Sequence, residues 1–470
     1  MTETKSRWSI LITILMSTFM ATLDSSIVNV ALPEMANVLN VTTSNIQLVA
    51  TSYLIVIVGT VLIFGRLGDM FGKTRVFKFG VTLFTIGSLL CGITHSFPML
   101  IIARIIQAIG AAGTMSTNQG IITEVFPQKE RGKALGLLGT SVALGSLVGP
   151  GLGGLIVGVV SWEFIFLINV PIGIVTLYLA FKLLPKGYKT AGGKMDGTGS
   201  ILFVISMVSL FAALNNGINV GFTAPIIIIG FTVAILSFLT FLFVEMKRDN
   251  PLIKLEIFKN KLFSLSILCG FISFVAIFCN NIILPFYLQD VMAYTPGYAG
   301  LILMVYPLVL TVVAPISGHL SDKIGSEILT FIGLVLISIG LLFMSTLNEN
   351  ATVLRMLSFI SIMSFGMGMF QSPNNSLVMS TVSKDKLGVA GSINALVRNM
   401  GMVSGIALAT TLLYSRMSAK IGYRVTDYVE GRNDVFIYGM KTVYVVAAII
   451  CFAATILTLI RLIAKKKPAS

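Results

Sequence analysis

Leu-Asp-Ser-Ser-Ile-Val-Asn-Val-Ala-Leu-Pro, residues 23–33, lies at the outer end of the first long apolar run of this chain. The run begins near Trp8 and is long enough for a membrane-spanning helix, yet it contains the ionisable side chain of Asp24. A carboxylate at bilayer depth costs about 2.5 to 3.5 kcal/mol, so it requires a partner, a water-filled cavity or a function. The stretch therefore predicts a membrane protein whose other helices surround an acidic group.

The composition supports this interpretation. Hydrophobic residues make up 55% of the 470 residues and charged residues only 11%, which excludes a soluble globular protein. The net charge of +14 does not indicate nucleic acid, because the basic residues lie in short connections between apolar runs, where they set membrane topology. The four cysteines lie in apolar runs without the spacing of a metal site or a disulfide, so neither is predicted. The first run is too long for a cleaved signal peptide and is predicted to remain as a helix.

Runs of about 20 apolar residues, the length that crosses the hydrocarbon core, recur along the whole chain. Their number predicts an all-α membrane protein with fourteen transmembrane helices. The predicted helices lie near residues 8–32, 45–65, 76–95, 98–124, 134–159, 163–183, 198–219, 223–244, 262–288, 297–318, 327–347, 352–380, 387–413 and 436–462.

The connections between these helices differ in charge. With the amino terminus in the cytoplasm, the inside connections are basic and the first five outside connections contain no Lys or Arg. This asymmetry predicts that both termini are cytoplasmic. The loop before the last helix is an exception, because it is basic and lies outside. The inside residues are Lys73, Arg75, Lys78, Lys129, Arg131, Lys133, Lys182, Lys186, Lys189, Lys194, Lys247, Arg248, Lys254, Lys259, Lys261, Lys465, Lys466 and Lys467.

Two eight-residue stretches resemble each other. Residues 65–72 read Gly-Arg-Leu-Gly-Asp-Met-Phe-Gly, and residues 318–325 read Gly-His-Leu-Ser-Asp-Lys-Ile-Gly. Both follow a predicted helix on the cytoplasmic side. Parallel repeats are typical of transporters with two six-helix halves and a substrate site between them near the midplane. We therefore predict an N-terminal half at 1–184, two inserted transmembrane helices at 185–250 and a C-terminal half at 251–470.

The stretch from Gly65 to Arg75 resembles the loop signature of the major facilitator superfamily. In that family the carboxylate that matches Asp69 latches the cytoplasmic side closed in the outward-facing state. The glycines, including Gly72, suit positive φ angles, and Asp69 is expected to engage Arg75. The alternative is a basic turn with topological value only. Residues 318–325 repeat this pattern with Asp322 at the position of Asp69, so the predicted role of a conformational switch extends to Asp322.

The fifth helix carries a second motif. Residues 145–154 read Gly-Ser-Leu-Val-Gly-Pro-Gly-Leu-Gly-Gly, so that Gly145, Gly149 and Gly153 share one face and Pro150 bends the axis. This pattern resembles the antiporter motif of drug-efflux facilitators, which implies packing at the interface between halves and favours export over uptake. The alternative is a common small-residue packing face.

The fourth helix contains Arg104 in a stretch, residues 100–110, that resembles the family's intramembrane arginine motif. The depths of Arg104 and Asp24 differ by about 3 Å at about 1.5 Å per residue, so the two can pair. We predict that this pair couples transport to protons. A purely structural ion pair is the alternative.

Polar residues inside the other helices are candidates for substrate contact. Arg398 lies midway along the thirteenth helix, and no acidic residue of the second half offers it a partner at that depth. A structural role is at least as favoured for it, and most amides in such helices form helix-to-helix hydrogen bonds. The predicted substrate-binding set is Asp24, Asn29, Gln107, Asn280, Asn281 and Arg398.

The resemblance covers nearly the whole chain, including Trp-Glu-Phe-Ile-Phe-Leu-Ile-Asn-Val-Pro at residues 162–171. Fourteen helices together with the Asp24 segment resemble the drug:proton antiporter branch. This implies a major facilitator fold and a monomer that exports amphipathic, cationic drugs across the cytoplasmic membrane in exchange for protons. No phosphate-binding Walker loop is present, and no enzyme activity, cofactor or metal is predicted. A facilitator for a specific metabolite or lipid, or a non-transporting membrane sensor, remains as an alternative.

Overall fold

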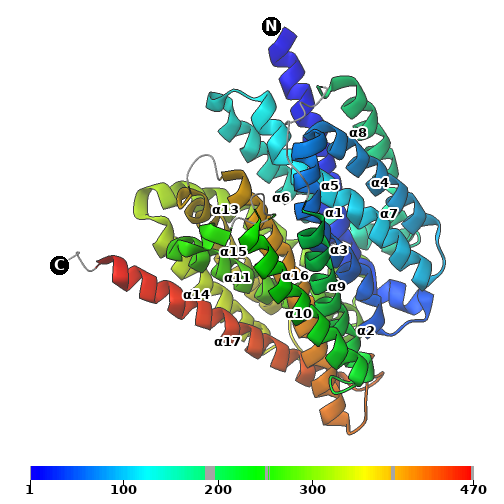
Figure 1. The fold of residues 1–470 in the computed structure, drawn as a ribbon. Helices are drawn as coiled ribbons and strands as arrows, with labels where there is room; N and C mark the ends of the chain where they lie inside the picture. Colours follow the sequence, from blue (N-terminus) through cyan, green and yellow to red (C-terminus); the bar gives the residue numbers. More distant parts are fainter. Residues whose placement is uncertain (1, 186–195, 249–251, 253–254, 383–386, 467–470) are drawn as a thin grey trace. The chain divides into compact units, whose positions relative to one another are not determined.

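The structure is a computed structural model that describes residues 2–185, 196–248, 252, 255–382 and 387–466. These residues are helical almost throughout and contain no strand (Figure 1). The helices are α1 (Thr2–Leu39), α2 (Thr43–Ile46), α3 (Leu48–Phe71), α4 (Lys73–Ile93), α5 (Phe97–Val125), α6 (Gln128–Val159), α7 (Phe164–Leu167), α8 (Asn169–Leu183), α9 (Gly197–Val220), α10 (Pro225–Lys247), η1 (Leu255–Lys259), α11 (Lys261–Phe286), η2 (Tyr287–Val291), α12 (Pro296–Leu303), α13 (Val305–Ile324), α14 (Ser326–Met344), α15 (Val353–Ser380), α16 (Leu387–Ile421) and α17 (Asn433–Lys466).

The fourteen predicted transmembrane helices are confirmed. Within the described residues, 14 helical segments are long and apolar enough to cross a membrane, and each matches one of the predicted runs. The largest differences lie at helix ends. The first span continues to Leu39, past Pro33, where the sequence predicts an end near residue 32. Proline is tolerated inside such helices because neighbouring groups satisfy the freed carbonyl.

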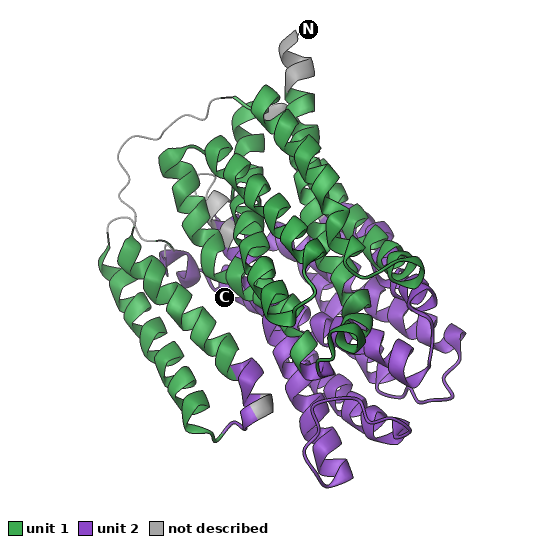
Figure 2. Cartoon of the chain, turned by 90° about the vertical axis from the view of Figure 1, so that its right-hand side faces the viewer, with its two compact units in different colours: residues 1–41, 45–213, 223–254 green, residues 42–44, 214–222, 255–470 purple. Residues whose placement is uncertain are grey.

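The chain forms two compact units (Figure 2). The first comprises residues 1–41, 45–213 and 223–254, and the second comprises residues 42–44, 214–222 and 255–470. Most of α9 and α10 is therefore counted with the first unit. The predicted division into two halves and a separate two-helix insertion stays a prediction.

The sequence repeat corresponds to a repeat in backbone conformation. Gly72 separates α3 from α4 with φ of 97°, and Gly325 separates α13 from α14 with φ of 92°. The N–H of Gly72 donates to the carbonyl of Gly68 at 3.0 Å, and the N–H of Gly325 donates to that of Ser321 at 3.0 Å. Side chains other than glycine rarely adopt this φ, so each glycine permits a sharp connection between two long helices.

Each unit also contains a helix pair that packs backbone against backbone. A Cβ atom at Gly80 of α4 would lie 2.7 Å from the carbonyl oxygen of Gly110 of α5. A Cβ atom at Gly333 of α14 would likewise lie 2.7 Å from the carbonyl oxygen of Gly366 of α15. Small residues permit this approach in membrane helices, and here they join two helices at the same place in both repeats.

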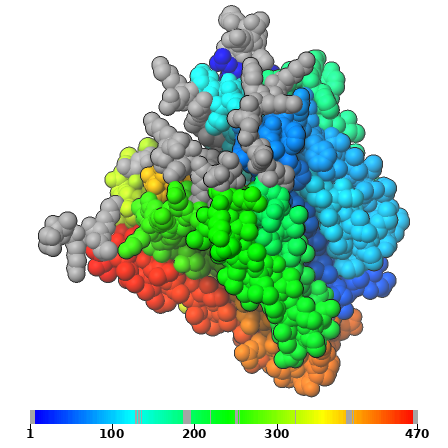
Figure 3. Space-filling model, viewed as in Figure 1, coloured from blue at the N-terminus to red at the C-terminus, as the bar shows by residue number. Residues whose placement is uncertain are grey.

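Helix α10 places a large apolar surface on the outside of its unit (Figure 3, green). Its exposed side chains are Ile226, Ile228, Ile229, Val233, Ile235, Leu236, Phe238, Leu239, Phe243 and Met246. A helix that is apolar and exposed along its length is typical of a face in contact with lipid.

Candidate functional site

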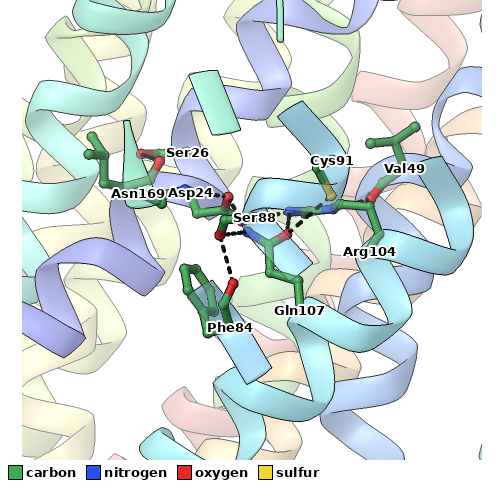
Figure 4. A network of polar contacts seen from close by, with 10 residues as sticks. Asp24, Ser26, Val49, Phe84, Ser88, Cys91, Arg104, Gln107 and Asn169 are labelled. Carbon is green, nitrogen blue, oxygen red and sulfur yellow. Dashed lines mark hydrogen bonds and ion pairs between the residues drawn. The ribbon is translucent and has the colours of Figure 1, made fainter. Parts of the chain in front are cut away.

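Asp24 lies completely buried in α1, and its predicted pairing with Arg104 is confirmed. Nη1 of Arg104 lies 2.6 Å from Oδ2 of Asp24, and the two side chains are 1% and 0% exposed (Figure 4). Charges removed from water this completely require both close contact and further hydrogen bonds. The neighbouring helices provide them.

The second carboxylate oxygen accepts two more hydrogen bonds. Nε2 of Gln107 donates to Oδ1 of Asp24 at 2.8 Å, and Nδ2 of Asn169 donates to it at 2.9 Å. Gln107 also lies within hydrogen-bond distance of Ser88, with 2.8 Å between Nε2 and Oγ. The carboxylate of Asp24 therefore has three hydrogen-bond donors, which come from α5 and α8.

Arg104 is held by more than its carboxylate partner. Its Nε donates to the backbone carbonyl of Val49 at 3.0 Å, and its Nη1 donates to Oε1 of Gln107 at 2.6 Å. The guanidinium carbon lies 4.2 Å from the centroid of the Tyr53 ring and 5.5 Å from that of Phe166. Such ring contacts attract a cation. The position of Arg104 therefore does not depend on the charge of Asp24 alone.

Asn169 is a site residue that the sequence analysis does not nominate. It begins α8 directly after an interruption at Ile168, whose N–H bonds back to the carbonyl of Phe164 in α7. It is completely buried and lies in the stretch 162–171. A lone amide within an apolar run was the available signal, although the sequence does not say toward which helix it points.

The glycine face of α6 packs directly against the Asp24 segment of α1. A Cβ atom at Gly145 would lie 2.9 Å from the carbonyl oxygen of Phe19, and one at Gly153 would lie 2.7 Å from Cγ1 of Ile27. The hydroxyl of Ser26 donates to the carbonyl of Gly145 at 3.0 Å. Gly149 lies between these contacts, next to the buried Pro150. The glycines thus fix the helix that carries the carboxylate.

The predicted cytoplasmic latch has a different ion pair from the one expected. Nζ of Lys73, at the start of α4, lies 3.6 Å from Oδ1 of Asp69 and 2.6 Å from Oε1 of Glu124. The expected pairing of Asp69 with Arg75 is absent from the described residues. Because α3 continues to Phe71 and α4 begins at Lys73, the turn at Gly72 brings Lys73 to the carboxylate of Asp69. Gly65 faces open space.

The remaining predicted residues divide between the units. Asn29 lies half-buried on α1 in the first unit. In the second unit Asn280 is buried and accepts a hydrogen bond from the hydroxyl of Tyr444 at 3.0 Å, with Asn281 half-buried beside it. The side chain of Asp322 lies outside the described residues. Arg398 lines a small pocket of the second unit.

A polytopic helical bundle with a buried, satisfied Asp–Arg pair and a repeated glycine turn defines a membrane transporter. The chain matches the Major Facilitator Superfamily over residues 14–406 and again over residues 266–470. It belongs to this family. The fold agrees, because the chain is similar to a bacterial homologue of the human lysosomal transporter Spinster, with a TM-score of 0.64 at 14% identity over 97% of this chain and 96% of that chain.

Two curated bacterial relatives differ in what their names describe. The riboflavin transporter RibZ of Clostridioides difficile (strain 630) is 34% identical over 455 residues, which is 97% of each chain. The multidrug resistance protein Stp of Mycobacterium tuberculosis (strain CDC 1551 / Oshkosh) is 29% identical over 404 residues, which is 86% of this chain and 75% of that protein. The protein is thus a multi-pass membrane transporter of the Major Facilitator Superfamily, a class that moves small molecules.

Proposed function

We propose that the protein is a proton-coupled antiporter that exports amphipathic drugs or toxic compounds across the cytoplasmic membrane by alternating access. The observation that carries the proposal is the buried Asp24–Arg104 pair at 2.6 Å. Asp24 is an ionisable group buried inside a helix bundle and held by three hydrogen-bond donors, and such groups are rare in membrane-spanning helices unless they function. The likeness to a multidrug resistance protein supports the choice of substrate.

The contacts suggest how a proton would act. Protonation of Asp24 removes the charge that attracts Arg104 and weakens all three hydrogen bonds to its carboxylate. Arg104 keeps Val49, Gln107 and the Tyr53 ring as partners, so it stays in place as a cation. A proton would thus change the packing of α1 against α5 and α8 and bias one state of the cycle.

The predicted cationic substrate would need further rearrangement. Asp24 is completely buried and already neutralised by Arg104, so a drug cation reaches its carboxylate only after that pair separates. We therefore assign the proton to Asp24 and keep direct contact with a cationic substrate as a separate prediction.

A second candidate function is transport of a specific metabolite. It is favoured by the likeness to the riboflavin transporter RibZ, which extends over 97% of both chains. Purified protein in proteoliposomes with an imposed pH gradient distinguishes the candidates. Drug export predicts that several cationic and neutral dyes move uphill against the gradient, whereas metabolite transport predicts movement of riboflavin alone. If no compound responded to the pH gradient, proton coupling would be rejected.

We expect the termini and the loops at Lys73, Lys129, Lys189 and Lys254 to face the cytoplasm, and Asn40 and the loop around Asp427 to face outward. Single cysteines at positions 40, 189 and 430 in intact cells test this with a membrane-impermeant thiol reagent. The four native cysteines are buried and should add little background. Labelling from outside at position 189 would contradict the predicted topology.

We expect Asp69→Asn and Glu124→Gln each to slow export about 1.4- to fivefold, since partly exposed ion pairs contribute about 0.2 to 1 kcal/mol. Each change removes a negative charge that forms an ion pair with Lys73, and neither changes the buried pair of Asp24 and Arg104. Initial rates at matched expression measure the effect. Glu256→Gln is a suitable control, because Glu256 is exposed and forms no ion pair within the described residues. Unchanged rates in both variants would remove the latch role.

A further inference from the structure

A small polar pocket lies within the second unit, around Arg398 of α16. Gly270 and Phe274 of α11, and Phe370 and Gln371 of α15, also line it. Its volume of about 10 Å³ is room for about one water molecule. A ligand group larger than a water molecule would have to widen it.

Arg398 carries a charge that has no counter-charge among the described residues. Its Nε is buried without a hydrogen-bond acceptor among the described residues, and none of them forms an ion pair with it. By contrast, Arg104 has a carboxylate, a backbone carbonyl and an amide oxygen as hydrogen-bond acceptors. A guanidinium inside a membrane protein without a counter-charge is costly, and an anionic group of a ligand would remove that cost.

The neighbouring amide side chains form hydrogen bonds with other groups and do not occupy the N–H donors of Arg398 and Gln371. Asn374 donates to the backbone carbonyl of Ser266 at 3.1 Å, and Asn394 donates to Oδ1 of Asn375 at 2.9 Å. Gln371 makes no hydrogen bond within the described part of the chain. A guanidinium fork beside an amide donor matches the two oxygens of a carboxylate.

We propose that the Arg398 pocket binds the carboxylate of an amphipathic aromatic substrate, with Phe274 against its apolar part. The proposal rests on the proposed transport function and names a substrate class for it. This substrate class differs from the cationic drugs predicted from the sequence. Asp24 is already paired with Arg104, whereas Arg398 in the second unit is a positive charge without an ion pair among the described residues. Substrates with a free acid group, zwitterions among them, should be preferred over their neutralised analogues.

The test compares a carboxyl-bearing rhodamine with its methyl ester, two dyes that differ only in the acid group. Binding to the purified full-length protein in lipid nanodiscs is measured by fluorescence anisotropy. We expect the wild-type protein to bind the acid about tenfold or more tightly than the ester, the range for hydrogen bonds to charged groups. Arg398→Gln should remove this preference by weakening acid binding alone, and Arg398→Lys should restore part of it.

Arg355→Gln is the matched control, because Arg355 also belongs to the second unit but is exposed and bonds to Thr346. It should keep the preference for the acid. Thermal unfolding confirms that each variant is folded. Equal binding of acid and ester by the wild-type protein would overturn the proposal, as would an equal loss for both dyes in Arg398→Gln. Because binding is measured without a pH gradient, failure of proton coupling would not be mistaken for failure of this pocket.

Discussion

Asp24→Asn is expected to abolish uphill export driven by a pH gradient while leaving the protein folded. Asparagine keeps the shape of the side chain and can still accept a hydrogen bond from Arg104, but it cannot gain or lose a proton. Proteoliposomes provide the sharpest measurement. Uphill accumulation of a dye should fall to the level of empty liposomes, whereas exchange of labelled for unlabelled dye, which needs no net proton movement, should continue.

Asp24→Glu serves as the companion variant and should retain part of the uphill transport, because it keeps a carboxyl group near Arg104. Asn169→Leu removes one donor to the carboxylate without removing its charge, and should alter the pH dependence of transport more than its maximum rate. Uphill export at the wild-type rate by Asp24→Asn would overturn the coupling mechanism. The proton would then have to be carried by another carboxylate, with Glu124, Glu163 and Asp290 as the candidates.

Gly149→Leu is expected to abolish export through packing. A Cβ atom at Gly149 would lie 2.8 Å from Cβ of Ser26 and 3.1 Å from the backbone nitrogen of Ile27, so any side chain must push α6 away from α1. Overpacking of this kind costs about 1 to 3 kcal/mol, and here it displaces the helix that carries Asp24. Pro150→Leu should also impair export. Transport assays at matched expression, with thermal unfolding in detergent, measure both effects.

The same helix offers a matched control. A Cβ atom at Gly139 of α6 would meet nothing within 4 Å, so Gly139→Leu adds the same side chain without the collision. It should export at close to the wild-type rate. Equal activity in Gly139→Leu and Gly149→Leu would show that the glycine face has no special part in transport.

The helices of this protein could be predicted because the bilayer imposes one length on every apolar run. The pairing of Asp24 with Arg104 could be predicted for a related reason, since counting residues from helix ends gives the depth of each charge. The depth of a residue in the membrane does not determine toward which neighbouring helix its side chain points. The sequence therefore does not reveal that Gln107 and Asn169 converge on the same carboxylate oxygen.

Contacts at turns were harder to predict. The expected pair of Asp69 with Arg75 is replaced by Lys73, because the helix ends lie closer together than the sequence indicates. The shared face of Gly145, Gly149 and Gly153 follows from helical periodicity, but its partner on α1 does not. The lack of an acidic partner for Arg398 is visible in the sequence, whereas the open amide of Gln371 beside it requires the fold.

The backbone contacts of α4 with α5, and of α14 with α15, also determine where each unit can bend. Backbone atoms of the paired helices touch at these glycines, so each pair should move as one rigid body. Flexing is then left to interrupted helices, at Gln47 between α2 and α3, at Ile168 between α7 and α8 and at Met304 between α12 and α13. Ile168 directly precedes Asn169. A hinge there would be linked mechanically to the carboxylate of Asp24. Bending at Ile168 and proton uptake by Asp24 would then be parts of the same conformational change.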